Sequence, residues 1–498
     1  MAIQPARRHP LLYQVNTRVM LRELGASLRR PATLDDVPDA FLDEVAARGF
    51  DWLWFLGVWR TGPAARAVSR SRADWREGFR RDLPDLSEED IAGSPFAVQG
   101  YEVSPLLGGD AALARVRERL ARRGVRLLLD FVPNHVSSDH PWVEAHPEWF
   151  VEGTEVDLAS APANWTRLST SRGPRILAHG RDPYFPGWPD TLQLDYRHPG
   201  LRGAMRRELL RVAGRCDGVR CDMAMLVLPD VFRRTWGERA GTAGAPFWPG
   251  TIAEVKAAHP EFAFMAEVYW DLEWELQQQG FDFTYDKRLY DRLRAGEVRP
   301  VREHLMAAPD FQDRSVRFLE NHDEPRAAAT FEPEAHRAAA IVSFLVPGLR
   351  FFHEGQLEGR KVFVSMHLDR RPAEPADAGL GEFYRALLSV LGRPEVHDGA
   401  WRLRECRPAW DGNPTWQGFV AFSWERGERR LLVAVNLGST QGQCWVDASF
   451  AGIEGAAVRL VDLTGPERHD RRGSELCGRG LYLDVPARRY HVFELKWT

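Results

Sequence analysis

The sequence lacks the features that would place the protein in a membrane, on a secretory route or on nucleic acid. The opening MAIQPARRHPLLYQV has no apolar segment as long as a secretory signal needs, and no stretch approaches the roughly 18 apolar residues of a membrane span. Lys and Arg total 66 against 70 Asp and Glu, which gives a net charge of −4 and no broad basic field. We therefore expect a cytoplasmic protein with a neutral ligand and with no nucleic-acid or membrane partner.

Cysteine is scarce, and the common cofactor motifs are missing. Five Cys without a CxxC pair predict reduced thiols rather than a disulfide framework or a zinc site. No GxxxxGK[ST] and no strand-linked GxGxxG occurs, which argues against nucleotide use. The chain also has no DxDxDG-like calcium loop near its first predicted strand. We expect no required cofactor and no obligatory metal.

The composition is that of a folded protein with a large core. Hydrophobic residues make up 44% and charged residues 27% of the chain. At 498 residues it is long for a single core and suits a barrel of about 250 to 400 residues with a smaller appended domain. The 18 Trp and 26 Phe serve mainly such a core, and those outside it would offer flat faces to sugars.

Short apolar or aromatic runs alternate with amphipathic segments through the first 400 residues. This alternation is typical of parallel β/α units, in either a barrel or a doubly wound sheet. Between the runs lie helical stretches such as 110–123, with Asp110 as N-cap and Gly124 as the stop. Eight runs favour a closed (β/α)8 TIM barrel. They are 11–15, 51–58, 125–132, 217–223, 262–269, 281–286, 315–320 and 348–353.

Two long connections and a change of pattern predict the domain organisation. The connections, 59–100 and 136–200, follow predicted strands, where barrel enzymes hold their substrates. The segment HLDRRPAEP at 367–375 is either a loop that closes over the site or a solvated connection. From residue 401 the text alternates as antiparallel strands do. We predict a catalytic barrel at 1–135 and 200–400, an inserted loop domain at 136–199 and a C-terminal β-sandwich at 401–498.

Polar side chains gather where four of the predicted strands end. Parallel strands of a barrel bring these ends to one rim, and that rim carries the active site in barrel enzymes. A structural rim would need fewer carboxylates. The side chains are Asp130, Asn134 and His135 after the third strand, Arg220 and Asp222 at the fourth, Glu267 at the fifth, and Asn321, His322 and Asp323 at the seventh.

Three of these residues suggest acid–base chemistry on a glycosidic bond. Arg220 and Asp222 lie two apart, so on a strand they face the same side and the Arg can keep the Asp ionised. Glu267 has Met265, Ala266 and Val268 around it in sequence, and apolar neighbours raise a carboxyl pKa. An ionised and a protonated carboxyl about 5 to 5.5 Å apart form the pair of a retaining glycosidase. Taken singly, an Arg-x-Asp pair is more often a rim salt bridge.

The combination DFVPNH, GVRCD, MAEV and ENHD resembles the four short conserved regions of the alpha-amylase family of glycoside hydrolases, glycoside hydrolase family 13. QGYEV at 99–103 is similar to a segment with a stacking Tyr, and LQLDY at 192–196 to a further region. The resemblance implies that Asp222 attacks the anomeric carbon, Glu267 is the general acid/base and Asp323 binds the distorted ring. It also implies a substrate-binding set of Tyr101, which would stack under the sugar, and His135, Arg220 and His322, which would line the same subsite.

One departure affects both calcium and the acceptor side. Many members of the family have a His four residues after the nucleophile, where this chain has Leu226. A calcium site that includes Asn134 is therefore in doubt. The unusual acceptor side also keeps two activities open: hydrolysis, as by an alpha-amylase or alpha-glucosidase, and transglycosylation, as by a glucanotransferase or a disaccharide-active enzyme.

Two other classes of protein compete with this interpretation. A non-catalytic carbohydrate-binding barrel would be expected to have lost a carboxylate, and all three are present. A metal hydrolase would need clustered ligands, and no HxH or HExxH occurs. We expect an α-glucan or oligosaccharide as substrate. Linkage, chain length, endo or exo mode and oligomeric state are left open.

Overall fold

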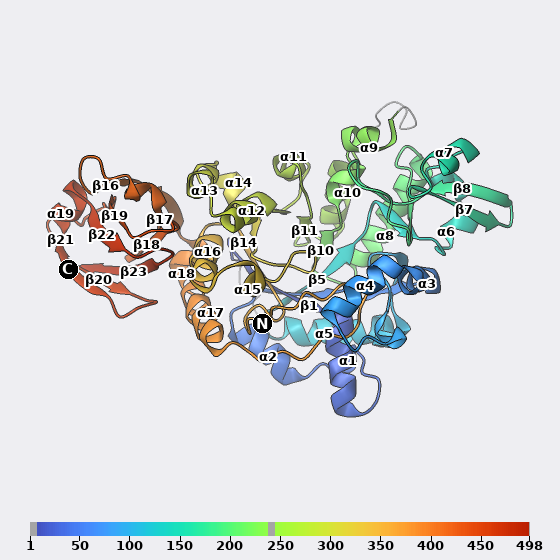
Figure 1. Ribbon diagram of the computed structural model, residues 1–498, viewed down its shortest axis with the longest axis horizontal. Coiled ribbons are helices and arrows are strands. Elements are labelled where there is room, and N and C mark those ends of the chain that lie inside the picture. Colours follow the sequence, from blue (N-terminus) through green and yellow to red (C-terminus); the bar gives the residue numbers. More distant parts are fainter. Residues whose placement is uncertain (1–6, 238–244, 498) are drawn as a thin grey trace.

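The computed structural model describes residues 7–237 and 245–497, and a closed barrel of eight parallel strands lies at its centre (Figure 1). Each of the eight predicted runs contributes one strand, so the predicted TIM barrel is confirmed. β1 pairs with both β14 and β2, which closes the circle. Around the barrel the strands are β1 (Leu11–Asn16), β14 (Leu349–His353), β13 (Ser315–Arg317), β12 (Phe283–Tyr285), β11 (Ala263–Ala266), β10 (Gly218–Cys221), β5 (Arg126–Phe131) and β2 (Trp52–Leu56).

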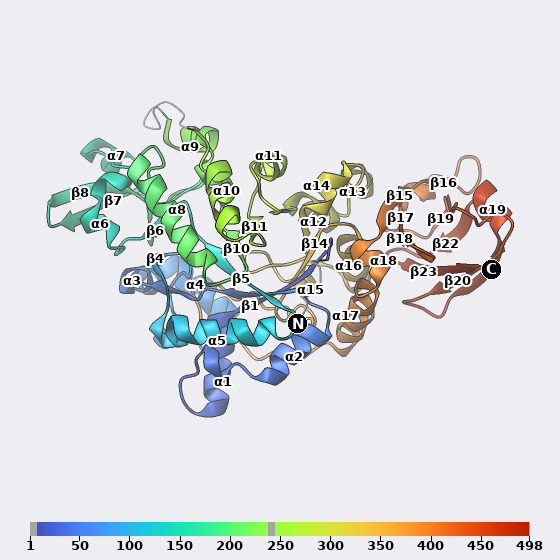
Figure 2. The same ribbon diagram turned by 180° about the vertical axis from the view of Figure 1, so that it is seen from behind.

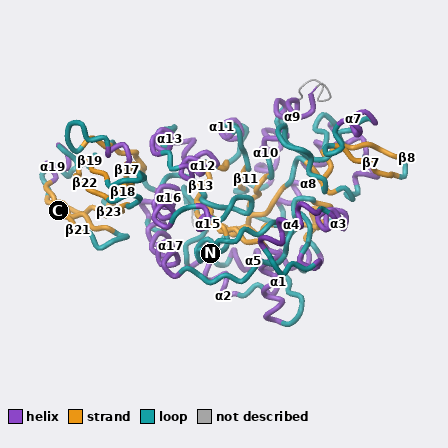
Figure 3. The backbone as a smooth tube through the Cα atoms, in the orientation of Figure 1, coloured by secondary structure: helices purple, strands orange, loops and turns teal. Residues whose placement is uncertain are grey.

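Helices surround the barrel, which explains why its strands are apolar on both faces (Figure 3). In β2, WLWFL is buried at every position. No helix within 7–237 and 245–497 is both long and apolar enough to cross a membrane. The larger helices are α1 (Thr17–Leu28), α2 (Asp39–Ala47), α5 (Gly109–Ala121), α8 (Pro199–Ala213), α9 (Pro229–Trp236), α10 (Trp248–Ala258), α12 (Lys287–Ala295), α16 (Pro333–Leu345) and α17 (Ala378–Leu391); shorter ones are α11 (Glu273–Gln278), α13 (Val298–His304), α14 (Pro309–Asp313), α15 (Ala327–Thr330) and α18 (Pro394–Asp398).

Helix α5 corrects one prediction about its start. The helix begins at Gly109, and its N-cap is Gly108 in the left-handed region (φ 95°), not Asp110. Asp110 lies in the first turn, where its carboxylate accepts the Val103 backbone N–H at 2.9 Å. A carboxylate in a first turn still favours the helix electrostatically. Gly124, with φ +74°, does lie just beyond the end of the helix.

Both long connections contain secondary structure. Residues 59–100 form α3 (Pro63–Ser71) and α4 (Ala73–Asp82), framed by the paired strands β3 (Trp59–Thr61) and β4 (Val98–Val103). Figures 1 and 2 place the second connection at the end of the molecule opposite the C-terminal strands. It holds β6 (His135–Ser137), α6 (Trp142–Ala145), α7 (Glu155–Ser160), β7 (Trp165–Thr170), β8 (Gly173–Ala178) and β9 (Thr191–Gln193).

The C-terminal residues form two antiparallel sheets around a separate core, as predicted for this part of the chain. Trp424 joins them to the barrel domain, because its indole N–H donates to the Leu345 carbonyl of α16 at 2.7 Å. The exact domain boundaries stay a prediction. The strand order of the larger sheet is β15 (Ala400–Arg404), β17 (Phe419–Arg426), β18 (Arg429–Asn436), β23 (Tyr490–Trp497), β20 (Ala457–Asp462) and β21 (Arg468–Arg472). The strand order of the smaller sheet is β16 (Cys406–Pro408), β19 (Gly442–Val446) and β22 (Leu481–Val485), and helix α19 (Gly473–Gly478) precedes β22.

The segment after β14 is fastened to the loop after β2. Leu368 bridges to Ile91 and is fully buried. Arg370 donates to Asp90 through Nε at 2.9 Å and Nη2 at 2.8 Å, and to Asp85 through Nη1 at 3.0 Å. The first part of the segment 367–375 is therefore packed against a neighbouring loop, whereas Ala373 and Pro375 in its second part are exposed.

Candidate active site

Neighbouring barrel strands bring the predicted site residues together. β5, β10 and β11 are adjacent in the barrel, and they carry Asp130, Arg220 and Glu267 at or just past their carboxyl ends. Asp222 follows β10 directly. Asp323 comes from the segment that follows β13, farther round the same rim. The barrel thus places four carboxylates around one guanidinium.

Arg220 is the centre of this cluster. Its side chain is 1% exposed, Nη1 lies 2.7 Å from Asp222 Oδ1, and Nη2 lies 2.7 Å from Glu267 Oε2. Asp130 Oδ1 is 3.7 Å from Nη1, and Asp323 Oδ2 is 4.0 Å from Nη2. One cation therefore faces three buried carboxyl groups and the partly exposed Asp323, and such a surplus of negative charge is relieved when at least one of them holds a proton.

Asp222 and Glu267 differ in how their oxygens are occupied. Asp222 receives the Arg220 bond on Oδ1, and no described group donates a hydrogen bond to its Oδ2. Both oxygens of Glu267 are occupied: Oε1 accepts from the Tyr269 hydroxyl at 2.8 Å, and Oε2 accepts from the Met223 backbone N–H at 2.7 Å. Asp222 is thus a fixed carboxylate with one oxygen available, whereas Glu267 is held on both sides.

The turns after both carboxylates have strained backbone. Met223, next to Asp222, has φ 42°, and Trp270 and Asp271, shortly after Glu267, have φ 65° and 64°. Residues other than Gly rarely adopt this left-handed backbone conformation, which costs about 1 kcal/mol or more per residue. At Met223 the strain aims the backbone N–H at Glu267.

The pKa directions separate the carboxylates into two kinds. Burial raises the pKa of Asp222, Arg220 opposes that rise, and the charges of Asp323 and Asp130 add to it. Burial likewise raises the pKa of Glu267 against the pull of Arg220. For Asp323 burial also acts upward, but His322 and Arg220 outweigh it, so the pKa is lowered. The predicted effect of Arg220 on Asp222 is present but does not prevail, and Glu267 has polar as well as apolar neighbours.

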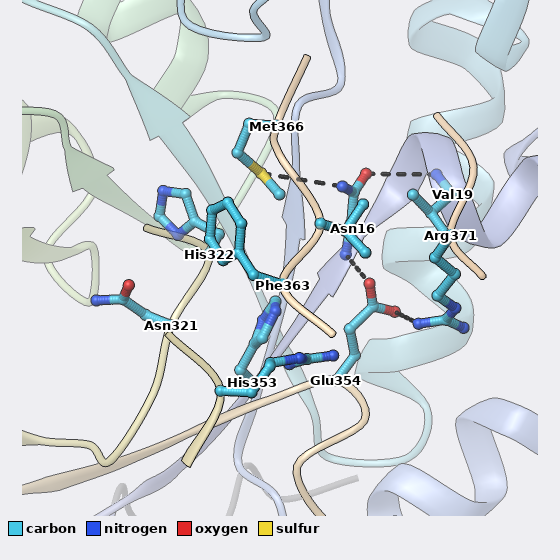
Figure 4. A pocket seen from close by; sticks show the side chains of 11 residues that line it. Asn16, Val19, Asn321, His322, His353, Glu354, Phe363, Met366 and Arg371 are labelled. Carbon is cyan, nitrogen blue, oxygen red and sulfur yellow. Dashed lines mark hydrogen bonds and ion pairs between the residues drawn. The ribbon is translucent and has the colours of Figure 1, made fainter. Parts of the chain in front are cut away.

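His322 connects the rim to the barrel interior. Its Nε2 lies 3.0 Å from Asp323 Oδ2, and its Nδ1 lies 3.0 Å from Gln14 Nε2. The Asp323 side chain is 45% exposed, in contrast to the buried Asp222 and Glu267. On the other side of His322 a small pocket is lined by Asn16, Met366 and the Glu354–Arg371 ion pair (Figure 4).

Tyr101 lies away from this cluster, and Phe96 takes the place facing it. The ring of Tyr101 stacks on Phe131 at 5.3 Å, and its hydroxyl donates to the Val132 carbonyl at 3.0 Å. The stacking position predicted for Tyr101 is thus not supported by its placement. Phe96 is half-buried, 5.1 Å from the Arg220 guanidinium and 5.4 Å from the His322 ring.

His135 borders the same region from the inserted segment. It is buried, with its ring 5.1 Å from that of Trp188. Burial lowers its pKa to about 3, and a hydrogen bond with the Phe96 backbone opposes part of that fall. His135 is therefore a neutral imidazole at physiological pH, suited to hydrogen bonding rather than to charge pairing.

The surroundings of Asn134 bear on the calcium question. Its side-chain oxygen accepts a hydrogen bond from Gln193 Nε2 at 2.9 Å, and its amide nitrogen lies 3.4 Å from His135 Nδ1. Leu226 is buried in the turn after Asp222. No group of three His, Cys, Asp or Glu that could hold a metal ion occurs in the described parts of the chain. The Asn134 amide oxygen thus accepts a hydrogen bond from Gln193 in this arrangement, and a calcium site at Asn134 stays a question raised by the sequence.

Comparison with known proteins establishes the family. The profile of the alpha-amylase catalytic domain matches residues 96–369, more than half of the chain, and the protein belongs to this family. Over 269 residues it is 26% identical to alpha-amylase MalA of Haloarcula japonica, covering 52% of this chain and 36% of that protein. Over 271 residues it is 28% identical to an alpha-1,4-glucan:maltose-1-phosphate maltosyltransferase of Burkholderia pseudomallei, covering 53% and 20%.

The matched region spans about a third or less of the length of these curated relatives. Among solved structures, the maltogenic alpha-amylase AmyB of Thermotoga neapolitana superposes with a TM-score of 0.69 at 19% identity, covering 98% of each chain. At this identity the similarity establishes the shared fold, including the C-terminal sheets.

Proposed function

We propose that the protein is a retaining glycosidase that acts on α-glucosidic bonds of α-glucans or malto-oligosaccharides. The observation that supports this most directly is the pair formed by Asp222 and Glu267 on either side of Arg220. Burial raises the pKa of both carboxyls, and they differ in their partners: Asp222 has an oxygen without a described donor, whereas Glu267, on the next strand, accepts hydrogen bonds on both oxygens. Two carboxyl groups with these different properties are what a double displacement requires.

In the first step Asp222 Oδ2 attacks the anomeric carbon while Glu267 gives its proton to the leaving oxygen. The bond to the leaving sugar breaks, and an ester joins the remaining sugar to Asp222. In the second step Glu267 takes a proton from water, the water oxygen attacks the anomeric carbon, and the Asp222 carboxylate is released. Asp323 would hold the distorted ring, with Phe96 stacking under it and His135, Arg220 and His322 lining the subsite.

Transfer to a sugar hydroxyl is the second candidate. The same carboxylates would serve it, with the acceptor hydroxyl in place of water. The turn after Asp222, Ala224–Val227, is wholly buried and apolar, which favours exclusion of water on the acceptor side. The similarity to maltosyltransferases points the same way. We also propose a cytoplasmic location, which rests on the sequence alone.

A product analysis with maltoheptaose tests the function. Wild type, Asp222→Asn and the exposed control Asp310→Asn are incubated with it, and NMR follows the anomer released. Shorter α-anomers from wild type and the control, but not from Asp222→Asn, support the proposal; longer products shift it to transfer. Equal turnover by Asp222→Asn contradicts the assigned nucleophile, and no turnover by any of the three proteins contradicts the substrate.

A trapping experiment tests the covalent step directly. A fluorinated glycosyl fluoride that slows the second step should add one sugar to the protein, and peptide mass spectrometry should locate it on Asp222. A label elsewhere would contradict the mechanism even if glucans were cleaved.

A further inference from the structure

The outer face of the small C-terminal sheet gathers aromatic side chains at the surface. In β16, β19 and β22, alternate side chains point to opposite faces. Cys444, Val446 and Leu483 point inward to the core. On the opposite face, Trp445 of β19 is paired directly with Arg407 of β16 and with Tyr482 of β22. This row crosses all three strands.

The aromatic rings of the row are held in fixed positions. The rings of Trp445 and Tyr482 lie 5.3 Å apart at 59° to each other, and the Arg479 guanidinium lies 5.8 Å from the Trp445 ring. The Trp445 indole N–H donates to the Ala409 carbonyl at 3.2 Å. Trp410, the residue after Ala409, is 56% exposed, and Tyr482 is 40% exposed.

A polar row lies beside the aromatic one on the same face. Gln443 and Asp484 are a direct cross-strand pair, two residues along from Trp445 and Tyr482. The Gln443 amide donates to Asp484 Oδ1 at 3.1 Å, and Gln441 donates to the same oxygen at 2.7 Å. Asn413 Nδ2 lies 3.4 Å from Gln443 Oε1. The amide and carboxylate groups are thus positioned next to the rings before any ligand arrives.

This combination matches the chemistry of a glucan chain. The C–H faces of a glucose ring pack on aromatic faces, and its hydroxyl groups exchange hydrogen bonds with amides and carboxylates. The charges are mixed, Arg407 and Arg479 against Asp484, so no ionic ligand is favoured. Three strands of three to five residues give a face too small for a stable dimer interface, which buries roughly 800 Å² per partner.

We propose that this Trp445 face, formed by Arg407, Gln443, Trp445, Tyr482 and Asp484, binds α-glucan together with the exposed Trp410, which follows the Ala409 carbonyl bonded by Trp445, at a second site separate from the carboxylate cluster. The inference rests on the proposed function, because α-glucan is the occupant. Figures 1 and 2 show β16, β19 and β22 at the end of the molecule opposite β7 and β8. A polymer held there would be kept near the enzyme without occupying its active site.

Affinity electrophoresis in gels with and without amylopectin tests the site. The parent is Asp222→Asn, so that the polymer survives the run, and the test variant adds Trp410→Ala and Tyr482→Ala. Both added positions are exposed, and thermal unfolding checks that the fold is kept. The matched control adds Leu28→Ala, a residue that is 45% exposed on α1. We expect the parent and the control to be retarded and the variant to bind at least about tenfold more weakly.

Equal retardation of parent and variant overturns the proposal, and so does a parent that amylopectin does not retard. A parent that migrates or sediments as a dimer only while Trp410 and Tyr482 are present would identify the occupant as a second copy and also overturn it. Turnover of maltoheptaose by Trp410→Ala/Tyr482→Ala in the active background should equal that of wild type. Weaker amylopectin binding without any maltoheptaose turnover would leave the Trp445 face standing and contradict the proposed function alone.

Discussion

Two buried arginines at opposite ends of the barrel show what distinguishes a reactive site from a structural one. Arg220, at the carboxyl end of the strands, faces four carboxyl groups. Arg350, at the amino end, donates to three backbone carbonyls, those of Phe344, His9 and Val396. The two side chains are equally hidden from solvent.

Their electrostatics are opposite. Burial lowers the pKa of Arg350 to about 9, because few charges are near enough to compensate. At Arg220 burial also acts downward, but Glu267 and Asp222 outweigh it and raise the pKa. Burial alone therefore does not mark a site. A reactive site is distinguished by a cluster of like-charged groups that cannot all be ionised at the same time.

The largest expected effect separates reactivity from stability within the cluster. Asp222→Asn should lower kcat on maltoheptaose by about 10⁴-fold, as removal of a nucleophile does. The raised pKa of Asp222 means that the unfolded state ionises first, so wild type loses stability as pH rises above about 4. The variant lacks this loss. Its Tm should exceed that of wild type at pH 7 by more than at pH 4, and a smaller difference at pH 7 would contradict the direction of the shift.

Substitution of each arginine by Met should affect stability at one end of the barrel and activity at the other. Arg350→Met leaves three carbonyls unpaired and should lower the free energy of unfolding by about 3 kcal/mol, with kcat little changed in the folded protein. Arg220→Met leaves carboxyls that can take up protons, so it should cost less stability but about 100-fold in kcat. Urea unfolding and kinetics on the same preparations measure both. The comparison fails if the two variants show the reverse order.

The pH dependence of kcat tests whether Tyr269 influences the pKa of Glu267. We expect a bell-shaped profile, with protonation of Asp222 on the acid side and deprotonation of Glu267 on the alkaline side. Tyr269→Phe removes a donor to the Glu267 carboxylate, which should raise its pKa and move the alkaline limb up by about one pH unit. Tyr196→Phe is the matched control, because its hydroxyl donates to the Pro133 carbonyl and makes no other hydrogen bond within the part of the chain that the structure describes. A shift in the control, or none in Tyr269→Phe, would rule out this role.

The smallest effect concerns the strained turn after Asp222. Met223→Gly should be about 1 kcal/mol more stable than Met223→Ala, since both variants lose the packing of the methionine side chain and only Gly adopts φ 42° without strain. It should also lower kcat slightly, because the N–H that holds Glu267 becomes less fixed. Ala224→Gly, next in the chain, should instead destabilise. Denaturant midpoints measure these differences, and a Met223→Gly variant no more stable than Met223→Ala would show that the turn is not strained.

The barrel could be predicted from the sequence because each strand is a separate apolar run. The rim followed from polar residues near the ends of those runs, such as Asp222 and Glu267. What failed depends on three-dimensional packing. QGYEV contains a tyrosine, and nothing in its spacing shows that Tyr101 turns to Phe131 while Phe96 reaches Arg220.

Tyr269 was not predicted from the sequence, although a signal for it was present. Tyr269 lies two residues beyond Glu267, the same spacing that linked Arg220 with Asp222. The pKa of Asp222 could not be predicted either. The sequence shows the neighbouring Arg220, whereas the opposing effect of burial comes from residues far apart in the chain.

The contacts between the loops after β2 and β14 limit how either loop can be changed. Ile91 and Leu368 share one bridge, and Arg370 reaches back to Asp85 and Asp90. A change of length in either loop removes partners from the other, so the two segments pack as one unit although some 280 residues separate them. A chimera that replaces 85–91 or 368–370 alone would lose these contacts, so the two segments would have to be exchanged together.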